Sequence, residues 1–305
     1  MSRMSQSKET NGHVAGALGS GLAPGAGRLA GLADIAVHAD GSARDEAKIA
    51  HAQALAEAAD AHLTVFLANH IALTPIPPGP GSEWLMAEIV KQSEKAGGET
   101  EEALRRRLPV SDAPTEVRRF DEMLAGLSNA AARIARTSDV FVMGRPYGET
   151  RHWPELVDAV LFEADRTVLV VPPEGRFPAV PRSVVIGWRD SAECAAAIDA
   201  AMPFLRACDL AILASVSEGG SDEERHREPA ADMARHLSRH GVDVEIRHLS
   251  DWARPAEALI REAQVTGAEM IVCGAYGRSR LREFILGGVT RDLLSECPVP
   301  LLLRH

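Results

Sequence analysis

The sequence predicts an α/β protein with two similar domains in tandem, each a parallel sheet covered by helices on both faces. The chain of 305 residues is too long for one small core and suits two domains of about 140 residues each. Short apolar runs alternate with longer helical stretches, which favours parallel strands joined by crossover helices. The second half of the chain then repeats the order of elements of the first half.

The chain begins with a segment that predicts no regular structure. Residues 1–31 are rich in Gly, Ser and Ala and lack hydrophobic periodicity, so we expect a disordered arm. Gly and Pro interrupt residues 12–33 too often for the apolar core of a signal peptide. No stretch approaches the roughly 20 apolar residues of a membrane span. These features predict a cytoplasmic protein without a membrane partner.

Residues 32–173 form the first predicted domain, in which each short apolar run is a strand and each longer stretch between two runs is a helix. Proline and glycine predict a loop at 74–81, and Gly97 and Gly98 predict a polar break inside the helix that follows. The strands are expected at 33–38, 63–68, 115–119, 140–143 and 167–171. The helices are expected at 43–59, 82–107, 121–136 and 154–163.

A linker rich in proline, residues 172–178, leads to the second predicted domain, residues 179–305. Gly241 and Gly267 follow two of its helices, at the place where a left-handed residue commonly ends a helix. The strands are expected at 182–187, 210–216, 242–248, 270–273 and 299–303. The helices are expected at 191–205, 222–240, 255–266 and from a glycine-rich segment to 296.

Charge and residue usage exclude several classes of function. The net charge of -10 argues against a nucleic-acid-binding surface, which normally carries a basic excess. No lysine follows Lys95, so the second half cannot form a Walker-type phosphate loop or a Schiff base with a lysine. The 4 cysteines make no CxxC pair, which predicts reduced and mostly buried thiols.

The segment 273–290 carries the strongest functional pattern. It leaves a predicted strand and enters the last helix, and its glycines follow the spacing G-x2-G-x9-G-G. Ligands of open α/β sheets bind at the carboxyl ends of the strands, where glycines let backbone N–H groups approach a phosphate. The alternative is that these glycines only permit tight turns and close helix packing. The candidate phosphate ligands are Gly274, Gly277, Arg278 (or Arg280 in its place), Gly287, Gly288, Val289 and Thr290.

This segment, together with the apolar sequence at 297–303, resembles the phosphate-binding loop and terminal strand of universal stress proteins. The resemblance is good over 182–305 and weak over 33–173. It implies two flavodoxin-like domains of the adenine nucleotide alpha hydrolase type, each with a sheet of five parallel strands. It also implies ATP or another adenine nucleotide as ligand, with Mg²⁺ as its companion ion, and places Val216 near the adenine.

Two departures from the family pattern affect the nucleotide site in the second half. Gly288 stands where the family has Ser or Thr, which removes a hydroxyl donor but keeps the backbone donors. Arg189 stands where members that bind ATP often have an acidic residue near the ribose, and Asp190 lies one position later. ATP binding by the second half is therefore expected from the glycine spacing rather than from a complete motif.

The first half shows the reverse pattern. It keeps the acidic turn Asp40-Gly41-Ser42 but lacks the phosphate glycines. Glu155 and Asp158 lie where the last helix should present its N–H groups, and a carboxylate there repels a phosphate. We therefore expect one nucleotide site in the chain, in the second half.

Three classes of function remain open. The first is a stress-response module that binds or senses an adenine nucleotide without efficient catalysis. The second is a ligand-free structural protein that forms dimers through the same fold. The third is an adenylating ATP-dependent enzyme, but its Ser-Gly-Gly-x-Asp-Ser loop is matched by neither 39–42 nor 188–191. No nucleophile elbow or HExxH motif occurs, so we expect no enzyme activity, no catalytic residue and no protein-held metal.

The last predicted strand of each half, at 167–171 and 299–303, is apolar and would otherwise leave an edge that invites aggregation. The family pairs subunits through this strand, so the resemblance implies antiparallel pairing of the two within one chain. The chain would then form an intramolecular pseudo-dimer, with further homo-oligomerisation left open. Pro300 cannot donate a ladder hydrogen bond and should lie at the strand start or outside the register. The alternative is two separate domains joined by the linker 172–178.

Overall fold

The apolar runs of the sequence form strands close to the expected positions. In the first half these are β1 (Asp34–Ala39), β2 (His62–His70), β3 (Thr115–Glu122), β4 (Val140–Gly144) and β5 (Val168–Val171). In the second half they are β6 (Ser183–Trp188), β7 (Leu210–Val216), β8 (Val244–Leu249), β9 (Met270–Gly274) and β10 (Leu301–Arg304). This computed structural model describes residues 29–73, 79–108, 110–147, 153–216, 223–250, 252–275 and 288–305.

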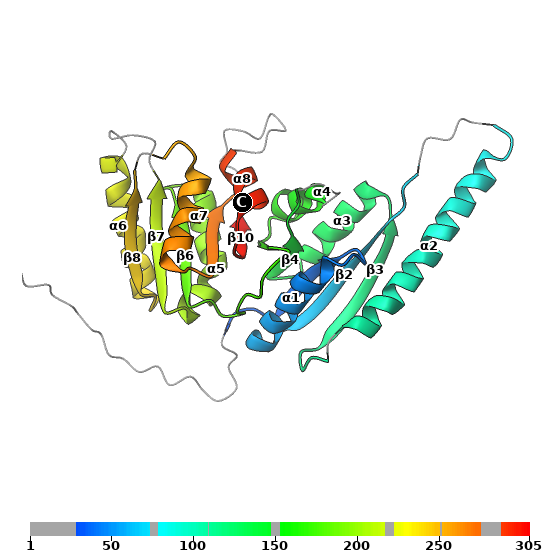
Figure 1. Ribbon diagram of the computed structural model, residues 1–305, viewed down its shortest axis with the longest axis horizontal. Coiled ribbons are helices and arrows are strands. Elements are labelled where there is room, and N and C mark those ends of the chain that lie inside the picture. The colour runs from blue at the N-terminus through cyan, green and yellow to red at the C-terminus, as the bar shows by residue number, and fades with distance from the viewer. Residues whose placement is uncertain are drawn as a thin grey trace, which may run out of the picture.

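The helices cross between strands and cover both faces of the sheet (Figure 1). They are α1 (Asp45–Ala59), α2 (Ser82–Arg107), α3 (Leu124–Ala135), α4 (Pro154–Asp158), α5 (Ala192–Ala207), α6 (Glu223–Arg239), α7 (Pro255–Thr266) and α8 (Gly288–Glu296). A π-helical turn, η1 (Ala159–Glu163), continues α4. Gly241 and Gly267 have the expected left-handed backbone, with φ of +82° and +67°. Within the described part of the chain, no helix has the length and apolar character needed to cross a membrane.

The described strands form one sheet in the order β3-β2-β1-β4-β5-β10-β9-β6-β7-β8. The five strands of each half are parallel to one another. The predicted α/β class with helices on both faces is confirmed. Each half has the order 3-2-1-4-5, which is that of dinucleotide-binding sheets, whereas flavodoxin has the order 2-1-3-4-5. The order reverses between β1 and β4 and between β6 and β9, and we call the carboxyl ends of these pairs the first and second switch points.

The two halves join through the predicted antiparallel pair of last strands. Leu301 of β10 pairs with Val170 of β5, and Leu303 pairs with Val168. Pro300 lies directly before β10, where its carbonyl oxygen accepts a hydrogen bond from the N–H of Ile271 at 2.9 Å. Both expectations are therefore confirmed, and the halves are not separate domains on a linker. We call the β5–β10 pair the seam.

Each face of the sheet carries a hydrophobic core that crosses the seam. One core contains buried residues of α1 and α5, and the other contains buried residues of α3, α4, α7 and α8. Leu29 and Leu32 belong to the first core, and the N–H of Leu29 donates to the carbonyl of Ala58 at 3.3 Å. The prediction of a disordered arm up to residue 31 is therefore wrong at its end, because Leu29 is buried against α1. Residues 1–28 lie outside the described residues.

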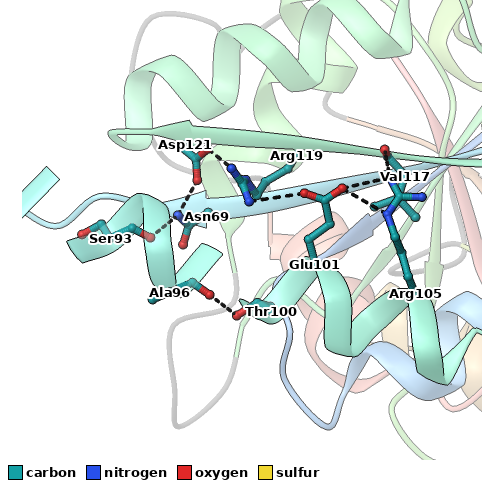
Figure 2. A network of polar contacts seen from close by, with 9 residues as sticks. All are labelled: Asn69, Ser93, Ala96, Thr100, Glu101, Arg105, Val117, Arg119 and Asp121. Atoms are coloured by element: carbon teal, nitrogen blue, oxygen red, sulfur yellow. Dashed lines mark hydrogen bonds and ion pairs between the residues drawn. The ribbon is translucent and has the colours of Figure 1, made fainter. Parts of the chain in front are cut away.

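Helix α2 is continuous, so the predicted break at Gly97 and Gly98 is wrong. A Cβ on Gly97 would lie 2.3 Å from Asn69 Nδ2 and 2.7 Å from Asp121 Oδ1. The glycine is therefore needed where α2 crosses the polar ends of β2 and β3, not for a bend. Asn69 fills that contact by donating to the carbonyl of Ser93 at 2.9 Å and to Asp121 at 2.6 Å (Figure 2).

Ion pairs extend this contact along α2 (Figure 2). Arg119 of β3 lies 2.9 Å from Asp121 and 3.3 Å from Glu101 of α2. Arg105 lies 2.8 Å from Glu101 and donates to the carbonyl of Val117 at 3.1 Å. The C-terminal half of α2 is thus held to the edge of the sheet by these polar groups together with the buried Leu104.

Candidate functional site

At the second switch point, a short capping side chain and a glycine allow helix α5 to pack closely on the end of strand β9. Ser191 caps α5, its Oγ accepting a hydrogen bond from the N–H of Cys194 at 3.3 Å. A Cβ on Gly274 would lie 2.6 Å from the nitrogen of Cys194 and 2.7 Å from the carbonyl carbon of Glu193. Only glycine allows this approach, so Gly274 is explained by the packing of the first turn of α5 on the end of β9.

The N-terminus of α8 forms the other side of the site. Gly288, its first residue, is exposed, and within the described residues a Cβ added there would meet no atom within 4 Å. Packing of the described chain therefore does not require glycine at this position. Val289 packs against the core, and Thr290 is only 6% exposed. The exposed end of the helix thus consists of backbone rather than of side chains.

The structure describes five of the eight nucleotide ligands predicted from the sequence. Gly274 ends β9, and Val216 ends β7, two strands away and about 10 Å across the sheet. Gly288, Val289 and Thr290 form the first turn of α8. Gly277, Arg278 and Gly287 lie outside the described residues, as does Arg280, so their part in the site stays a prediction.

Charged groups gather at the start of α5, where the sequence pattern departs from the family. Glu193 is buried, and a hydrogen bond from its own N–H lowers the pKa of its carboxyl, with Ser191, His305 and Arg189 adding to the effect. Nδ1 of His305 lies 3.0 Å from the carbonyl oxygen of Ala275. The side chain of His305 and the residue after Gly274 are therefore in contact, and Arg189 adds a positive charge near Glu193.

A polar pair beside Val216 was not predicted from the sequence. Ser215 and His248 are opposite each other on β7 and β8, and Ser215 Oγ lies 2.7 Å from His248 Nδ1. Ser215 is buried. The two residues are 33 positions apart in the sequence and meet only through the register of two parallel strands, so no local motif predicts the pair.

The first switch point contains a buried ionic cluster that was also missed. Lys48 Nζ lies 2.9 Å from Asp45 Oδ1 and 3.3 Å from His38 Nδ1, and all three residues are buried. The carboxylate of Asp45 accepts hydrogen bonds from the backbone of the turn, including the N–H of Gly41 at 2.7 Å. Trp153, which precedes α4, is buried over the same turn and donates from Nε1 to Asp40 Oδ2 at 2.9 Å.

Burial and proximity shift the pKa values in this cluster. Burial alone would raise the pKa of Asp40, but the charge of Lys48 and hydrogen bonds from Ser42 and Trp153 outweigh it and hold that pKa well below its usual range. Burial raises the pKa of Asp45 although Lys48 opposes the shift. Burial and the charge of Lys48 both lower the pKa of His38. Side chains of the first half, some neutral and some charged, thus fill the first switch point.

The strand registers identify the positions that correspond in the two halves. Ile35 pairs with Val140 as Val184 pairs with Met270, so residues of β1 and α1 correspond to residues 149 positions later (184 minus 35). His38, Asp45 and Lys48 then correspond to Gly187, Cys194 and Ala197. Trp153 precedes α4 as Gly287 precedes α8. Large or ionisable residues in the first half therefore replace small ones in the second.

The prediction of a degenerate first site rested on the absent phosphate glycines and on Glu155 and Asp158. Glu155 is exposed, and burial together with Glu155 raises the pKa of Asp158 to about 6. An alignment of the two halves could have indicated the buried cluster, because it places Lys48 opposite Ala197.

Comparisons with known proteins relate the second half of the chain to a family. Residues 188–305 match the model of the Universal stress protein family. The stress response protein NhaX of Bacillus subtilis (strain 168) is 32% identical over 81 residues, which are 27% of this chain and 48% of that protein. The chain thus matches about half the length of this curated relative.

Two solved structures are similar to almost the whole chain. A universal stress protein from Archaeoglobus fulgidus DSM 4304 has a TM-score of 0.68 at 14% identity, covering 89% of this chain and 95% of that one. A protein of unknown function from Pseudomonas aeruginosa PAO1 has a TM-score of 0.54 at 15% identity, covering 91% and 93%. At these identities the likeness concerns the fold, and it extends over both halves.

Proposed function

We propose that this chain is a stress-response module that binds one adenine nucleotide, such as ATP, because its residues 188–305 match the model of the Universal stress protein family. The site is the second switch point, and the nucleotide is bound without efficient turnover. The observation that carries the proposal is the N-terminus of α8. It lies after β9 at the end of the sheet where such folds bind ligands, and it begins with an exposed Gly288 that packing does not require.

A phosphate suits this helix end for two physical reasons. The first N–H groups of a helix have no partner within the helix, and the helix dipole places partial positive charge there. Because Gly288 has no side chain, its backbone N–H is accessible to the phosphate oxygens. Gly277, Arg278 and Gly287 are proposed to complete the phosphate site, and Val216 to contact the base. Mg²⁺ is proposed only as a companion ion of the bound phosphates.

The proposal excludes efficient hydrolysis. Among the described residues of the second half, Ser215 and His248 come nearest to a nucleophile and base, at 2.7 Å. Ser215 is buried, and directly opposite residues on neighbouring strands explain the contact without a substrate. A steady-state rate of about 1 per second or more, within the usual enzyme range, contradicts this part of the proposal.

Gly288→Asp tests the site itself. An aspartate at the first helical position favours the helix dipole, so the fold should survive, but its carboxylate repels a phosphate at the same place. We expect titration calorimetry to find one ATP per wild-type chain and at least a 100-fold weaker affinity in the variant. Gly288→Ser is the matched control and should bind ATP at least as well as the wild type.

Other outcomes select other functions. Two nucleotides per chain contradict the single-site proposal, and an unchanged affinity in Gly288→Asp moves the site away from α8. A wild-type chain that neither retains nucleotide through purification nor binds added adenine nucleotide favours the ligand-free structural protein. Mass spectrometry of the supernatant after denaturation detects retained nucleotide directly.

A further inference from the structure

We infer that the first half of the chain positions helix α8, and that nucleotide binding at the second switch point depends on Arg145 and Tyr147 of the first half. This inference rests on the proposed function for its nucleotide and on contacts between the two halves for its geometry. Both residues follow β4, so they approach α8 from the neighbouring half.

Arg145 holds the C-terminal end of α8. Its Nη2 donates to the carbonyl oxygen of Cys297 at 2.6 Å and lies 3.5 Å from that of Glu296. The last carbonyls of a helix have no partner within the helix and carry partial negative charge, so a guanidinium satisfies both needs. Arg145 is thus a helix cap supplied by the other half of the chain.

Tyr147 contacts the opposite end of the same helix. The guanidinium of Arg291 lies over the ring of Tyr147, 5.6 Å from its centroid. Arg291 directly follows Thr290 in the first turn of α8, beside the proposed phosphate ligands. The two contacts therefore fix α8 at both ends, and the one at Tyr147 bears on the turn that would meet the phosphate.

A third contact reaches the end of β9 from the same side. Phe162 of η1 packs edge-on against His305, with ring centroids 4.8 Å apart, and His305 contacts the carbonyl of Ala275. Arg304 adds an ion pair to Asp165 at 3.1 Å. Residues on both sides of the proposed phosphate site are therefore in contact with the first half.

The second half holds α8 by apolar packing and by exposed charges. Leu293 and Leu294, in the C-terminal half of the helix, are buried in the same core as residues of α7. Arg254, before α7, lies 3.1 Å from Asp292 and 3.2 Å from Glu296 of α8. Exposed ion pairs of this kind contribute little to stability. The buried leucines lie beyond the first turn of α8, so the contact of Arg291 with Tyr147 adds to the placement of the N-terminal turn, and Arg145 adds to the placement of the C-terminal end.

The test uses the full chain and compares Tyr147→Ala with Tyr147→Phe. The phenylalanine keeps the ring under Arg291, and the alanine removes it. We expect Tyr147→Ala to bind ATP about 10-fold more weakly, as a cation–π contact of ordinary strength predicts, while Tyr147→Phe binds as the wild type does. Without nucleotide, hydrogen exchange at the amides of residues 293–297 should be at least about 3-fold faster in Tyr147→Ala than in Tyr147→Phe.

Arg136→Ala is the matched control for Arg145→Ala. Arg136 also donates to a backbone carbonyl, that of Glu163 at 3.2 Å, but within the first half. Arg145→Ala should accelerate exchange at 293–297 and weaken ATP binding, and Arg136→Ala should do neither. Unchanged exchange at 293–297 in both Tyr147→Ala and Arg145→Ala overturns the inference. If the wild type binds no adenine nucleotide, the proposed function fails, and the exchange experiment still decides whether the first half positions α8.

Discussion

The two switch points have the same backbone plan and opposite contents. At the first, Lys48, Asp45 and His38 are buried in mutual contact, and Trp153 covers the acidic turn. At the second, the corresponding positions carry Gly, Cys and Ala, and the first residue of α8 is exposed. The comparison shows that the same fold can fill a switch point with its own charged side chains, or can leave backbone groups there accessible to a ligand. Substitutions and changes of pH can test how far the stability of the first half depends on its internal charges.

Lys48→Met should have the largest effect. It leaves the carboxylates of Asp45 and Asp40 without their buried cation, and breaking a buried pair by removing one partner destabilises by about 3–5 kcal/mol. Urea unfolding measures the loss. Lys95→Ala is the control, because its pair with Glu99 is exposed and should contribute less than about 1 kcal/mol. A loss in Lys48→Met no larger than in the control would show that the cluster does not stabilise the first half.

Acid should destabilise the chain through the buried histidines of the first half. Burial lowers the pKa of His51 from 6.5 to about 4, although its hydrogen bond to the carbonyl of Phe177 opposes the shift. The unfolded chain therefore binds the proton first. The contribution of His51 to the free energy of unfolding is fully present above pH 6.5 and falls as the pH drops towards 4. At pH 4.5 the loss from this group alone is about 2.5 kcal/mol.

Urea unfolding at pH 7 and pH 4.5 measures this dependence. His51→Gln removes the titrating group and should flatten the slope, even if it lowers stability at pH 7. His38 adds to the loss in the same direction, because burial and Lys48 lower its pKa as well. Asp158 works in the opposite direction, because its pKa is raised to about 6 and the folded chain therefore binds that proton first. An equal pH dependence in His51→Gln and in the wild type would contradict the prediction.

Trp153→Phe should have the smallest effect of the three. The phenylalanine keeps an aromatic ring over the turn but removes the indole N–H that donates to Asp40. Hydrogen bonds to charged groups contribute about 1.5–3 kcal/mol, and the loss should lie near the lower end because Asp40 keeps Ser42 and Lys48. In an Asp40→Asn background the same substitution should cost less. Equal losses of stability in both backgrounds would mean that the stabilising effect of the Trp153 indole does not come from its hydrogen bond to Asp40.

Much of the fold was predictable because it depends on local pattern. The bounds of α2, β7 and α7 agree with those predicted, and the apolar last strands indicated the seam. The break at Gly97 was predicted wrongly, because the reason for that glycine lies in Asn69 and Asp121, which are distant in the sequence.

The candidate site was predictable in part. Glycine spacing indicated α8 and the end of β9. The burial of Lys48 could not be read from its neighbours, because a lysine three residues after an aspartate is usually a solvated helix pair. Its other partner, His38, and the covering Trp153 come from β1 and from the start of α4. Only folding brings these groups together.

The seam also changes what dilution and mutation can do to the molecule. Two separate subunits paired through their last strands would come apart at low concentration, but two halves on one chain meet at an effective concentration of about millimolar or more. A symmetric dimer must carry every substitution twice, once on each side of its axis. Here each half can vary alone, so a lysine can be buried on one side of the pseudo-axis while its counterpart remains alanine.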